Sequence, residues 1–226
     1  MAVRVAAADV SGLDTQRSLW LVGEARRQKV LRLRSESARR QSLGIGLLAK
    51  MLLEEEELSE ELLTYSPDAP GRLQGKPALP AETGRFISMS HAGRIAVCVL
   101  SDTPAGVDAE EERRVHQALL RREFSPEDAG RVNASADPAR AFLRLWTAKE
   151  SLFKAGGVWA DAKRTVSEAV RAGGFVLHYA EIGEAPRAFL CLCTREGADI
   201  SGRFGRFLAN GGYAEQRNLI FKRGEP

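Results

Sequence analysis

The sequence predicts a fold that mixes helices with strands, and three observations lead to this prediction. Apolar residues recur at helical spacing from Leu43 to Leu52. They alternate with polar residues from Phe86 to His91 and then run without a break from Ile95 to Leu100, as in a hairpin. Asp137-Pro138 and Gly156-Gly157 are a typical helix start and stop. The 226 residues can bury one large core or two small ones, so folding needs neither a disulfide nor a metal.

The composition excludes several classes of protein. Apolar residues make up 44% and charged residues 28%, which is ordinary for a globular protein. A net charge of +3 does not by itself predict nucleic-acid binding. The three cysteines, Cys98, Cys191 and Cys193, lie in apolar runs without CxxC spacing, so we expect buried thiols. Because neither a signal peptide nor a stretch of about 20 apolar residues is found, we expect a cytoplasmic protein without a membrane partner.

The first hundred residues predict the following elements in order. Val3 to Val10 is an opening strand, and Ser18 to Leu53 predicts two helices with a break near Ser35, which can cap the second. The acidic run Glu54 to Glu61 is predicted to be a solvated helix end. Thr64 to Gly84 is rich in Pro and Gly and is therefore expected to be a loop before the hairpin.

The second half begins with the turn Thr103 to Gly106, which is the expected boundary between two domains. A short strand follows at Val107 to Glu110, and the capped helix comes later. Gly174 to Ala180 and Arg187 to Cys193 are strand-like. The order of helices and then a hairpin in each half suggests a duplication, although no sequence repeat supports it.

Asp108 and Glu110 are candidate metal ligands. Alternate side chains of a strand share a face, so these two carboxylates project together with Cα atoms roughly 6.5 Å apart. Mg²⁺ prefers such oxygen ligands. The alternative is an ordinary charged strand end, because charged residues continue to Arg114.

The helix from Phe142 to Lys154 carries the second candidate group. Glu150 and Lys154 are four residues apart and share a face. The alternative interpretation is a surface Glu–Lys pair worth about 0.3 to 0.5 kcal/mol. A third candidate, His91, ends the strand Ser88-Met89-Ser90-His91, where it is either a structural histidine or a phosphate contact.

These segments together resemble a known family, the larger, pseudodimeric (Sfp-type) class of the 4′-phosphopantetheinyl transferase superfamily. The resemblance covers about residues 40 to 155 and rests on four motifs in the order of that family. They are Gly75-Lys76-Pro77, Phe86-Ile87-Ser88-Met89-Ser90-His91, Gly106-Val107-Asp108-Ala109-Glu110 and Trp146-Thr147-Ala148-Lys149-Glu150-Ser151-Leu152-Phe153-Lys154-Ala155.

The resemblance implies a role for each matching residue. Asp108, Glu110 and Glu150 match the carboxylates that hold Mg²⁺, or Mn²⁺ in its place, against the pyrophosphate of coenzyme A. Glu150 also matches the general base, so the implied catalytic residues are Glu150, His91 and Lys154. The implied contacts to coenzyme A are Arg26, Lys29, Arg40, Gly75, Lys76, Pro77, Ser90, His91, Asp108, Lys149 and Lys154.

The family further implies an α+β fold of two similar α/β subdomains with the active site in the cleft between them. Residues 1–105 would contact coenzyme A, and residues 106–226 would carry the metal and the catalytic carboxylates. The implied reaction moves phosphopantetheine from coenzyme A to a serine of an apo acyl or peptidyl carrier protein. A monomer without a nucleic-acid partner is expected. Met89 is larger and Ala109 smaller than the family pattern, and the final 201–226 segment matches nothing recognisable.

Two other functions compete with the transferase. One is a nucleic-acid-binding module in which the first predicted helices grip phosphates, and it leaves the carboxylates unexplained. Its basic residues are Arg26, Arg27, Lys29, Arg32, Arg34, Arg39 and Arg40. The other is a catalytically idle relative kept as a scaffold, which the loss of a metal carboxylate would favour, and none is lost.

Overall fold

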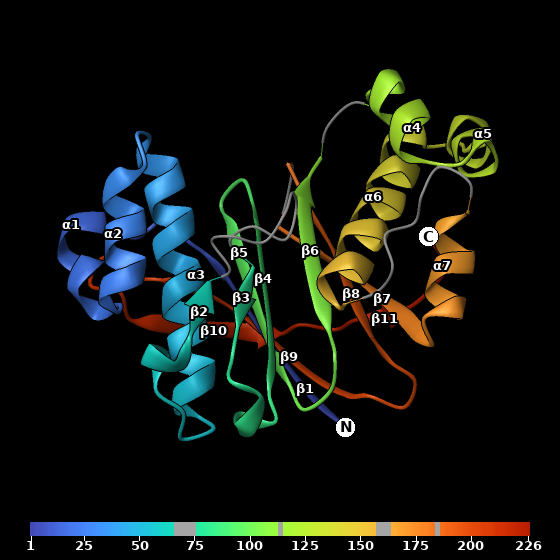
Figure 1. Cartoon of the computed structure of the whole chain (residues 1–226). Coiled ribbons are helices and arrows are strands. Elements are labelled where there is room, and N and C mark those ends of the chain that lie inside the picture. Colours follow the sequence, from blue (N-terminus) through green and yellow to red (C-terminus); the bar gives the residue numbers. More distant parts are fainter. Residues whose placement is uncertain (66–75, 113–114, 157–163, 184–185) are drawn as a thin grey trace. The chain divides into compact units, whose positions relative to one another are not determined.

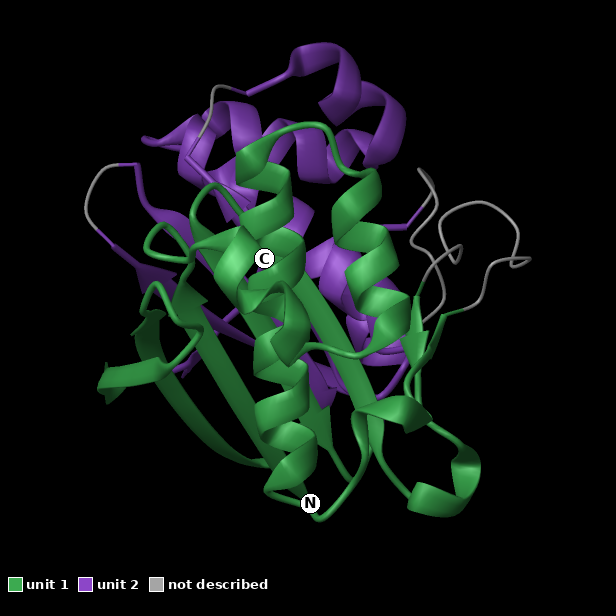
Figure 2. Cartoon of the chain, turned by 90° about the vertical axis from the view of Figure 1, so that its left-hand side faces the viewer, with its two compact units in different colours: residues 1–103, 199–220 green, residues 104–198, 221–226 purple. Residues whose placement is uncertain are grey.

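The computed structural model describes residues 1–65, 76–112, 115–156, 164–183 and 186–226. These residues form two compact units, coloured separately in Figure 2. Unit 1 contains residues 1–103 and 199–220, and unit 2 contains residues 104–198 and 221–226. The sequence prediction had one division, between residues 105 and 106, and did not foresee the return of residues 199–220 to unit 1. The functions predicted for the two halves stay predictions.

Unit 1 is built on a five-stranded sheet with the strand order β10-β9-β1-β5-β4 (Figure 1). Its strands are β1 (Ala2–Asp9), β4 (Phe86–Ala92), β5 (Ile95–Ser101), β9 (Asp199–Phe207) and β10 (Tyr213–Asn218). The central strand β1 pairs antiparallel with β5 and parallel with β9. The predicted hairpin is confirmed as β4 and β5, and Gly93 at its turn has a φ of 52°. The tail of the chain therefore completes the sheet that the first residues begin.

The helices of unit 1 lie before the hairpin in the sequence. They are α1 (Thr15–Ser18), the 3-10 turn η1 (Leu19–Leu21), α2 (Glu24–Arg32) and α3 (Glu36–Glu54). The predicted break near Ser35 is confirmed, because the Ser35 hydroxyl accepts a hydrogen bond from the Ala38 N–H at 3.2 Å and caps α3. A Cβ on Gly44 would lie 2.3 Å from Val10, so this glycine lets α3 pack closely beside the end of β1.

The acidic run after α3 is a largely solvated helix end, as predicted, with Glu54, Glu55 and Glu57 exposed. Glu55 and Glu56 also form ion pairs, which the sequence does not indicate. Glu56 binds Arg4 and Arg85, each at 2.8 Å, and Glu55 binds Arg203. These pairs connect the end of α3 to β1, β9 and the residue before β4. The 3-10 turn η2 (Glu60–Leu62) follows α3, and the described part of the predicted loop Thr64 to Gly84 contains the short elements β2 (Thr64–Tyr65), β3 (Pro77–Ala78) and η4 (Ala81–Thr83).

Unit 2 has a four-stranded antiparallel sheet with the order β11-β7-β8-β6. The strands are β6 (Gly106–Glu111), β7 (Phe175–Ile182), β8 (Ala188–Arg195) and β11 (Lys222–Arg223). The helices are α4 (Gln117–Glu123), α5 (Pro126–Ala134), α6 (Pro138–Lys154) and α7 (Val166–Ala172). In Figure 1, α6 runs along β6, and a Cβ on Gly106 would lie 2.1 Å from the main-chain oxygen of Ser151. Gly106 thus permits the close packing of α6 on β6.

The predicted bounds of α6 are confirmed. Asp137 caps the helix by accepting a hydrogen bond from the Arg140 N–H at 3.0 Å, and Pro138 occupies the first turn. Gly156 has a φ of 86°, a conformation that favours glycine and ends the helix. The three cysteines are buried and free, as predicted. No helix among the described residues is both long and apolar enough to cross a membrane.

Candidate functional site

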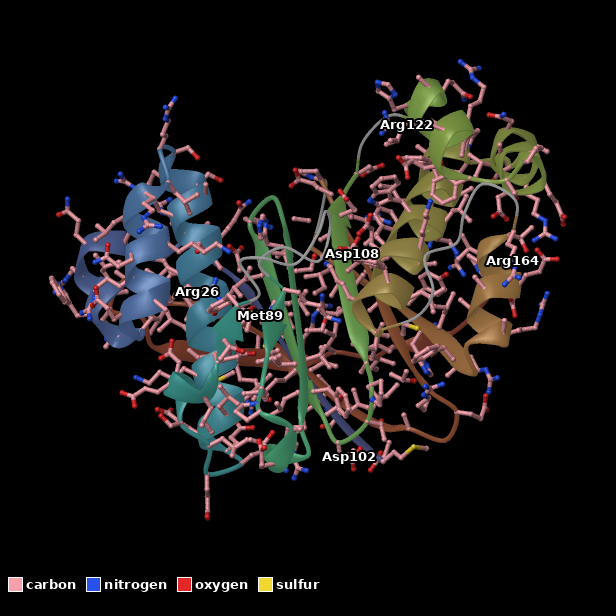
Figure 3. All side chains as sticks on the ribbon, viewed as in Figure 1. Arg26, Met89, Asp102, Asp108, Arg122 and Arg164 are labelled. Atoms are coloured by element: carbon pink, nitrogen blue, oxygen red, sulfur yellow. The ribbon has the colours of Figure 1, made fainter. Side chains whose placement is uncertain are left out.

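An ion pair between β6 and α6 is the centre of the candidate site in unit 2. The Lys154 ammonium donates a hydrogen bond to Oδ1 of Asp108 at 2.7 Å. Asp108 is only 5% exposed, and Figure 3 shows it on β6, beside α6. A buried carboxylate requires such a partner, because an unpaired charge away from water is costly. The contact fixes the last turn of α6 against the strand.

Strand geometry explains why β6 presents its carboxylates to α6. Gly106 packs against α6 and Asp108 bonds to it, so the alternate residues of β6 face that helix. Glu110 is next in this series. Val107 and Ala109, which are buried, alternate with the carboxylates on the other face. The strand therefore separates its polar and apolar side chains between its two faces.

Helix geometry adds Glu150 to the same region of unit 2. Glu150 lies one turn before Lys154 and shares its face of α6. Between them, Ser151 is buried and donates a hydrogen bond to Sγ of Cys191 at 3.3 Å. Cys191 is the residue of β8 that pairs with Asp108 of β6. The strand that carries Asp108 and Glu110 thus belongs to the sheet on which the helix of Glu150 packs.

The three predicted metal ligands have the right chemistry but are not gathered around one point. Asp108, Glu110 and Glu150 offer carboxylate oxygens, the donor type that Mg²⁺ prefers. Within the described ranges, no three Asp, Glu, His or Cys side chains are close enough to hold a metal ion together. In the structure, the Lys154 ammonium lies beside Asp108 and pairs with its carboxylate.

Lys149 extends from α6 toward α4. It is only 2% exposed, and its ammonium donates to the main-chain oxygen of Glu123 and lies 3.4 Å from the carboxylate of that residue. The same ammonium lies 4.9 Å from the centre of the Phe124 ring. Lys149 therefore joins α6 to the end of α4. A contact to coenzyme A through this ammonium would require these contacts to be given up.

Arg26 is buried in unit 1. It is 4% exposed, and its Nη2 donates to the hydroxyl of Tyr65 and, at 3.5 Å, to Sδ of Met89 (Figure 3). The guanidinium also lies 5.1 Å from the centre of the Tyr65 ring. Gly46 of α3 leaves room for the Arg26 side chain, since a Cβ there would approach it to 2.8 Å. The sequence does not indicate Tyr65 as a site residue, because nothing local connects it to a residue 39 positions earlier.

Lys29 lies beside this cluster. Its ammonium is 5.9 Å from the centre of the Tyr65 ring. Desolvation by burial and the charge of Arg26 lower the pKa of Lys29. Burial alone lowers the pKa of Lys76. Both lysines thus occupy surroundings in which an added anion would stabilise the ammonium form.

The remaining predicted contacts of unit 1 lie on several elements. Nε of Arg40 lies 3.4 Å from Glu36 on the same helix. Pro77 is in β3 and pairs with Tyr65, and Gly75 lies outside the described residues. Ser90 and His91 are on the edge strand β4, with His91 exposed. The structure therefore brings Pro77 to the cluster of Arg26, Tyr65 and Lys29, while Arg40 lies at an ion pair of its own.

Comparison with known proteins adds an independent observation. Residues 104–170 match the family model of the 4′-phosphopantetheinyl transferase superfamily. This segment contains all the predicted site residues of unit 2, including Asp108, Glu110, Glu150 and Lys154.

Three curated proteins are similar to parts of the chain. The 4′-phosphopantetheinyl transferase Sfp of Bacillus subtilis (strain 168) is 25% identical over 64% of this chain and 64% of its own length. The 4′-phosphopantetheinyl transferase psf-1 of Bacillus pumilus is 29% identical over 53% of the chain and 51% of its own length. The 4′-phosphopantetheinyl transferase HetI of Nostoc sp. (strain PCC 7120) is 33% identical over 37% of the chain and 39% of its own length. The chain thus covers less than two thirds of each relative.

Proposed function

We propose that this chain, a member of the 4′-phosphopantetheinyl transferase superfamily, transfers phosphopantetheine from coenzyme A to a serine of an apo carrier protein. The observation that carries the proposal is the 2.7 Å contact between Lys154 and Asp108, with Glu150 one turn away on the same helix face. A strand that turns its carboxylates toward a helix with a glutamate and a lysine supplies groups for phosphoryl transfer.

We further propose that Asp108, Glu110 and Glu150 hold Mg²⁺, or Mn²⁺ in its place. The support is their donor chemistry and their position on two elements packed together, β6 and α6. When bound, the ion neutralises the charge of the pyrophosphate of coenzyme A.

Lys154 would meet a phosphate oxygen of the coenzyme. An ammonium has three N–H donors, so one lysine can bind a carboxylate, here that of Asp108, and a phosphate at the same time. The carboxylate holds the ammonium in position before the phosphate arrives. In this role Lys154 stabilises the negative charge that grows on the phosphate oxygens during transfer.

Glu150 would accept the proton of the carrier serine. The serine oxygen then bonds to the β-phosphorus of coenzyme A, and the bond from this phosphorus to the bridging oxygen breaks. Adenosine 3′,5′-bisphosphate leaves with that electron pair. Such general-base assistance typically contributes about 10²- to 10⁴-fold to a rate. Because Glu150 is held on the well-capped helix α6, its backbone position is fixed by the fold.

The coenzyme is proposed to use cationic groups of unit 1. Lys29 and Lys76 have lowered pKa values because of burial, so a phosphate beside either one would restore its preferred charge. Pro77, Ser90 and His91 are the other expected contacts. Arg40 would contribute if it exchanged its ion pair with Glu36 for a phosphate.

The nucleic-acid alternative loses support because several of its basic residues are engaged within unit 1. Arg26 is buried, and Arg27 is bound to Glu24. Nε of Arg39 donates to the main-chain oxygen of Leu33 at 2.9 Å. The carrier protein, the cytoplasmic location and the monomeric state stay predictions.

The experiment that tests the function is the appearance of adenosine 3′,5′-bisphosphate. The chain would be incubated with coenzyme A, Mg²⁺ and an apo acyl or peptidyl carrier protein, and the nucleotide measured by chromatography. We expect the product only with a carrier that has its target serine. Equal release with the same carrier carrying alanine at that position would indicate hydrolysis and contradict the transferase function.

A further inference from the structure

A pocket of about 300 Å³ lies in unit 2, away from the proposed reaction site. Its walls come from one face of α5 and one face of the first half of α6. The residues that matter for its chemistry are Arg131, Val132, Arg140, Ala141, Arg144 and Leu145. This volume is at the lower end of the range of small-molecule sites. Arg140 and Glu150 are ten residues apart on α6, so about 15 Å of helix separates the pocket wall from the proposed base.

The floor of the pocket is apolar. Val132 and Leu145 are buried, and Ala141 presents only a methyl group beside them. Contact between such a floor and an apolar group is more favourable than contact with water. The pocket therefore favours a ligand that has an apolar body.

Two arginines at the rim have only weak partners. Arg131 pairs with Glu127 at 2.7 Å, but the two side chains are 59% and 61% exposed. Arg140 pairs with Glu181 and is 50% exposed. Ion pairs this exposed contribute little, so an arriving anion can share or replace them. The fork of a guanidinium suits the two oxygens of a carboxylate.

The third arginine, Arg144, is held by uncharged groups. Its guanidinium carbon lies 4.0 Å from the centre of the Tyr179 ring, and its Nη2 donates to the main-chain oxygen of Glu225 at 2.6 Å. Neither partner neutralises the positive charge. Ring stacking leaves the edge of a guanidinium available for other hydrogen bonds.

The two acidic residues of the lining are already occupied by main-chain groups. Oδ2 of Asp128 accepts from the Val166 N–H at 2.9 Å, and Oδ1 of Asp137 accepts from the Arg140 N–H at 3.0 Å. Burial also raises the pKa of Asp128, which disfavours its charged form. The lining therefore holds three arginines against two aspartates, and both aspartate carboxylates are engaged by main-chain N–H groups.

From these contacts we infer that the pocket binds a small organic carboxylate with an apolar body, with the carboxylate at Arg131, Arg140 and Arg144 and the body on Val132, Ala141 and Leu145. This site is separate from the proposed transfer reaction. Its test needs neither coenzyme A nor a carrier protein, so failure of one proposal leaves the other standing.

The probe is octanoate, titrated into the full chain with methyl groups labelled for NMR. Octylamine, which has the same chain and a positive head group, is the matched control. We expect saturable shifts of the methyl signals of Val132, Ala141 and Leu145 with octanoate and much smaller shifts with octylamine. No shift with octanoate, or equal shifts with both compounds, would overturn the inference.

Two exposed arginines allow the charge requirement to be tested in a folded protein. Arg131→Gln and Arg140→Gln should each weaken octanoate binding about threefold to tenfold, because one partly screened contact is lost. Arg171→Gln, an exposed change on α7 of the same unit, is the control and should bind octanoate like the unchanged protein. Unchanged binding by both pocket variants would contradict the proposed role of the arginines.

Discussion

Unit 1 and unit 2 both hold a cationic side chain among predicted site residues, but they satisfy its charge differently. In unit 1, Arg26 bonds to the hydroxyl of Tyr65 and the sulfur of Met89, which are uncharged. Its buried Nε has no hydrogen-bond partner among the residues described. In unit 2, Lys154 bonds to the carboxylate of Asp108. Positive charge is therefore in surplus in the Arg26 cluster, whereas the charge of Lys154 is paired with a carboxylate.

The difference indicates which ligand each region favours. The positive charge of the cluster of Arg26, Lys29 and Tyr65 would be stabilised most by a bound anion, such as a phosphate of coenzyme A. The negative charge of Asp108, Glu110 and Glu150 would be stabilised most by a further bound cation, such as Mg²⁺. In the proposed function, the phosphates of coenzyme A would supply the anion and Mg²⁺ the further cation. The four predictions below test this comparison.

The largest effect is expected from Glu150→Gln, which removes the proposed proton acceptor of the acidic region. We expect the rate of carrier modification to fall about 10²- to 10⁴-fold, because an amide cannot accept the serine proton. The control is Glu196→Gln, an exposed glutamate of unit 2 that pairs with Arg223. Rates would be measured at saturating coenzyme A, and a Glu150→Gln rate equal to that of the control would remove Glu150 from the mechanism.

Gly106→Ala should disturb the packing that brings Lys154 to Asp108. The new Cβ would lie 2.1 Å from the Ser151 oxygen and 2.4 Å from the Ala155 nitrogen, so α6 must move. We expect the free energy of unfolding to fall by about 1 to 3 kcal/mol in urea denaturation, together with a loss of transfer.

The matched control for that change is Gly130→Ala in α5, where the added methyl group meets no atom within 4 Å. Replacing this helical glycine should raise the free energy of unfolding by about 0.5 to 1 kcal/mol. If Gly106→Ala were as stable as this control, the close approach of α6 to β6 would not be required for the fold.

Arg26→Met tests the surplus charge of unit 1. We expect the dissociation constant of coenzyme A to rise about tenfold, equivalent to about 1.4 kcal/mol, because a cation near the phosphates is lost. Its neighbour on α2 provides the control, since Arg27 is bound to Glu24 and Arg27→Met should change binding less. Calorimetric titration with coenzyme A measures the dissociation constants of both variants. Equal affinities of the two variants would count against the Arg26 cluster as the anion site.

The smallest effect is a pH dependence caused by Lys29 and Lys76. Their pKa values lie below the ordinary 10.5 because of burial, so the folded chain binds fewer protons than the unfolded chain just below that pH. The free energy of unfolding should therefore gain a small contribution as the pH rises through this alkaline range. A bound phosphate reverses the shift, so coenzyme binding should take up protons there and weaken as the pH rises.

Calorimetry in buffers of different ionisation enthalpy measures this proton uptake. Arginine stays charged throughout this range, so the double variant Lys29→Arg, Lys76→Arg should take up fewer protons. Unchanged uptake in the double variant would show that other groups are responsible.

Local signals account for the elements that could be predicted from the sequence. Asp137-Pro138 and Gly156 bound α6 because capping and a left-handed glycine act over a few residues. The β4–β5 hairpin follows from alternation and a glycine turn. The pairing of β1 with β9 joins residues almost two hundred positions apart, so no local pattern indicates it.

The candidate site shows the same limit. That Glu150 and Lys154 share a face follows from helical spacing alone. The bond from Lys154 to Asp108 spans 46 positions and depends on how α6 packs on β6. Arg26 and Arg27 are adjacent and chemically identical, yet only Arg26 is buried, because Gly46 leaves space for its side chain. Burial of one basic residue in a basic run is a property of tertiary packing.

The most direct test of the central claim is the intact mass of an apo carrier protein after incubation with this chain, coenzyme A and Mg²⁺. We predict that the carrier gains the mass of one phosphopantetheine group, that a chelator prevents the gain and that added Mg²⁺ restores it. If a panel of acyl and peptidyl carrier proteins showed no gain with a folded chain that binds coenzyme A, the transferase function would be contradicted.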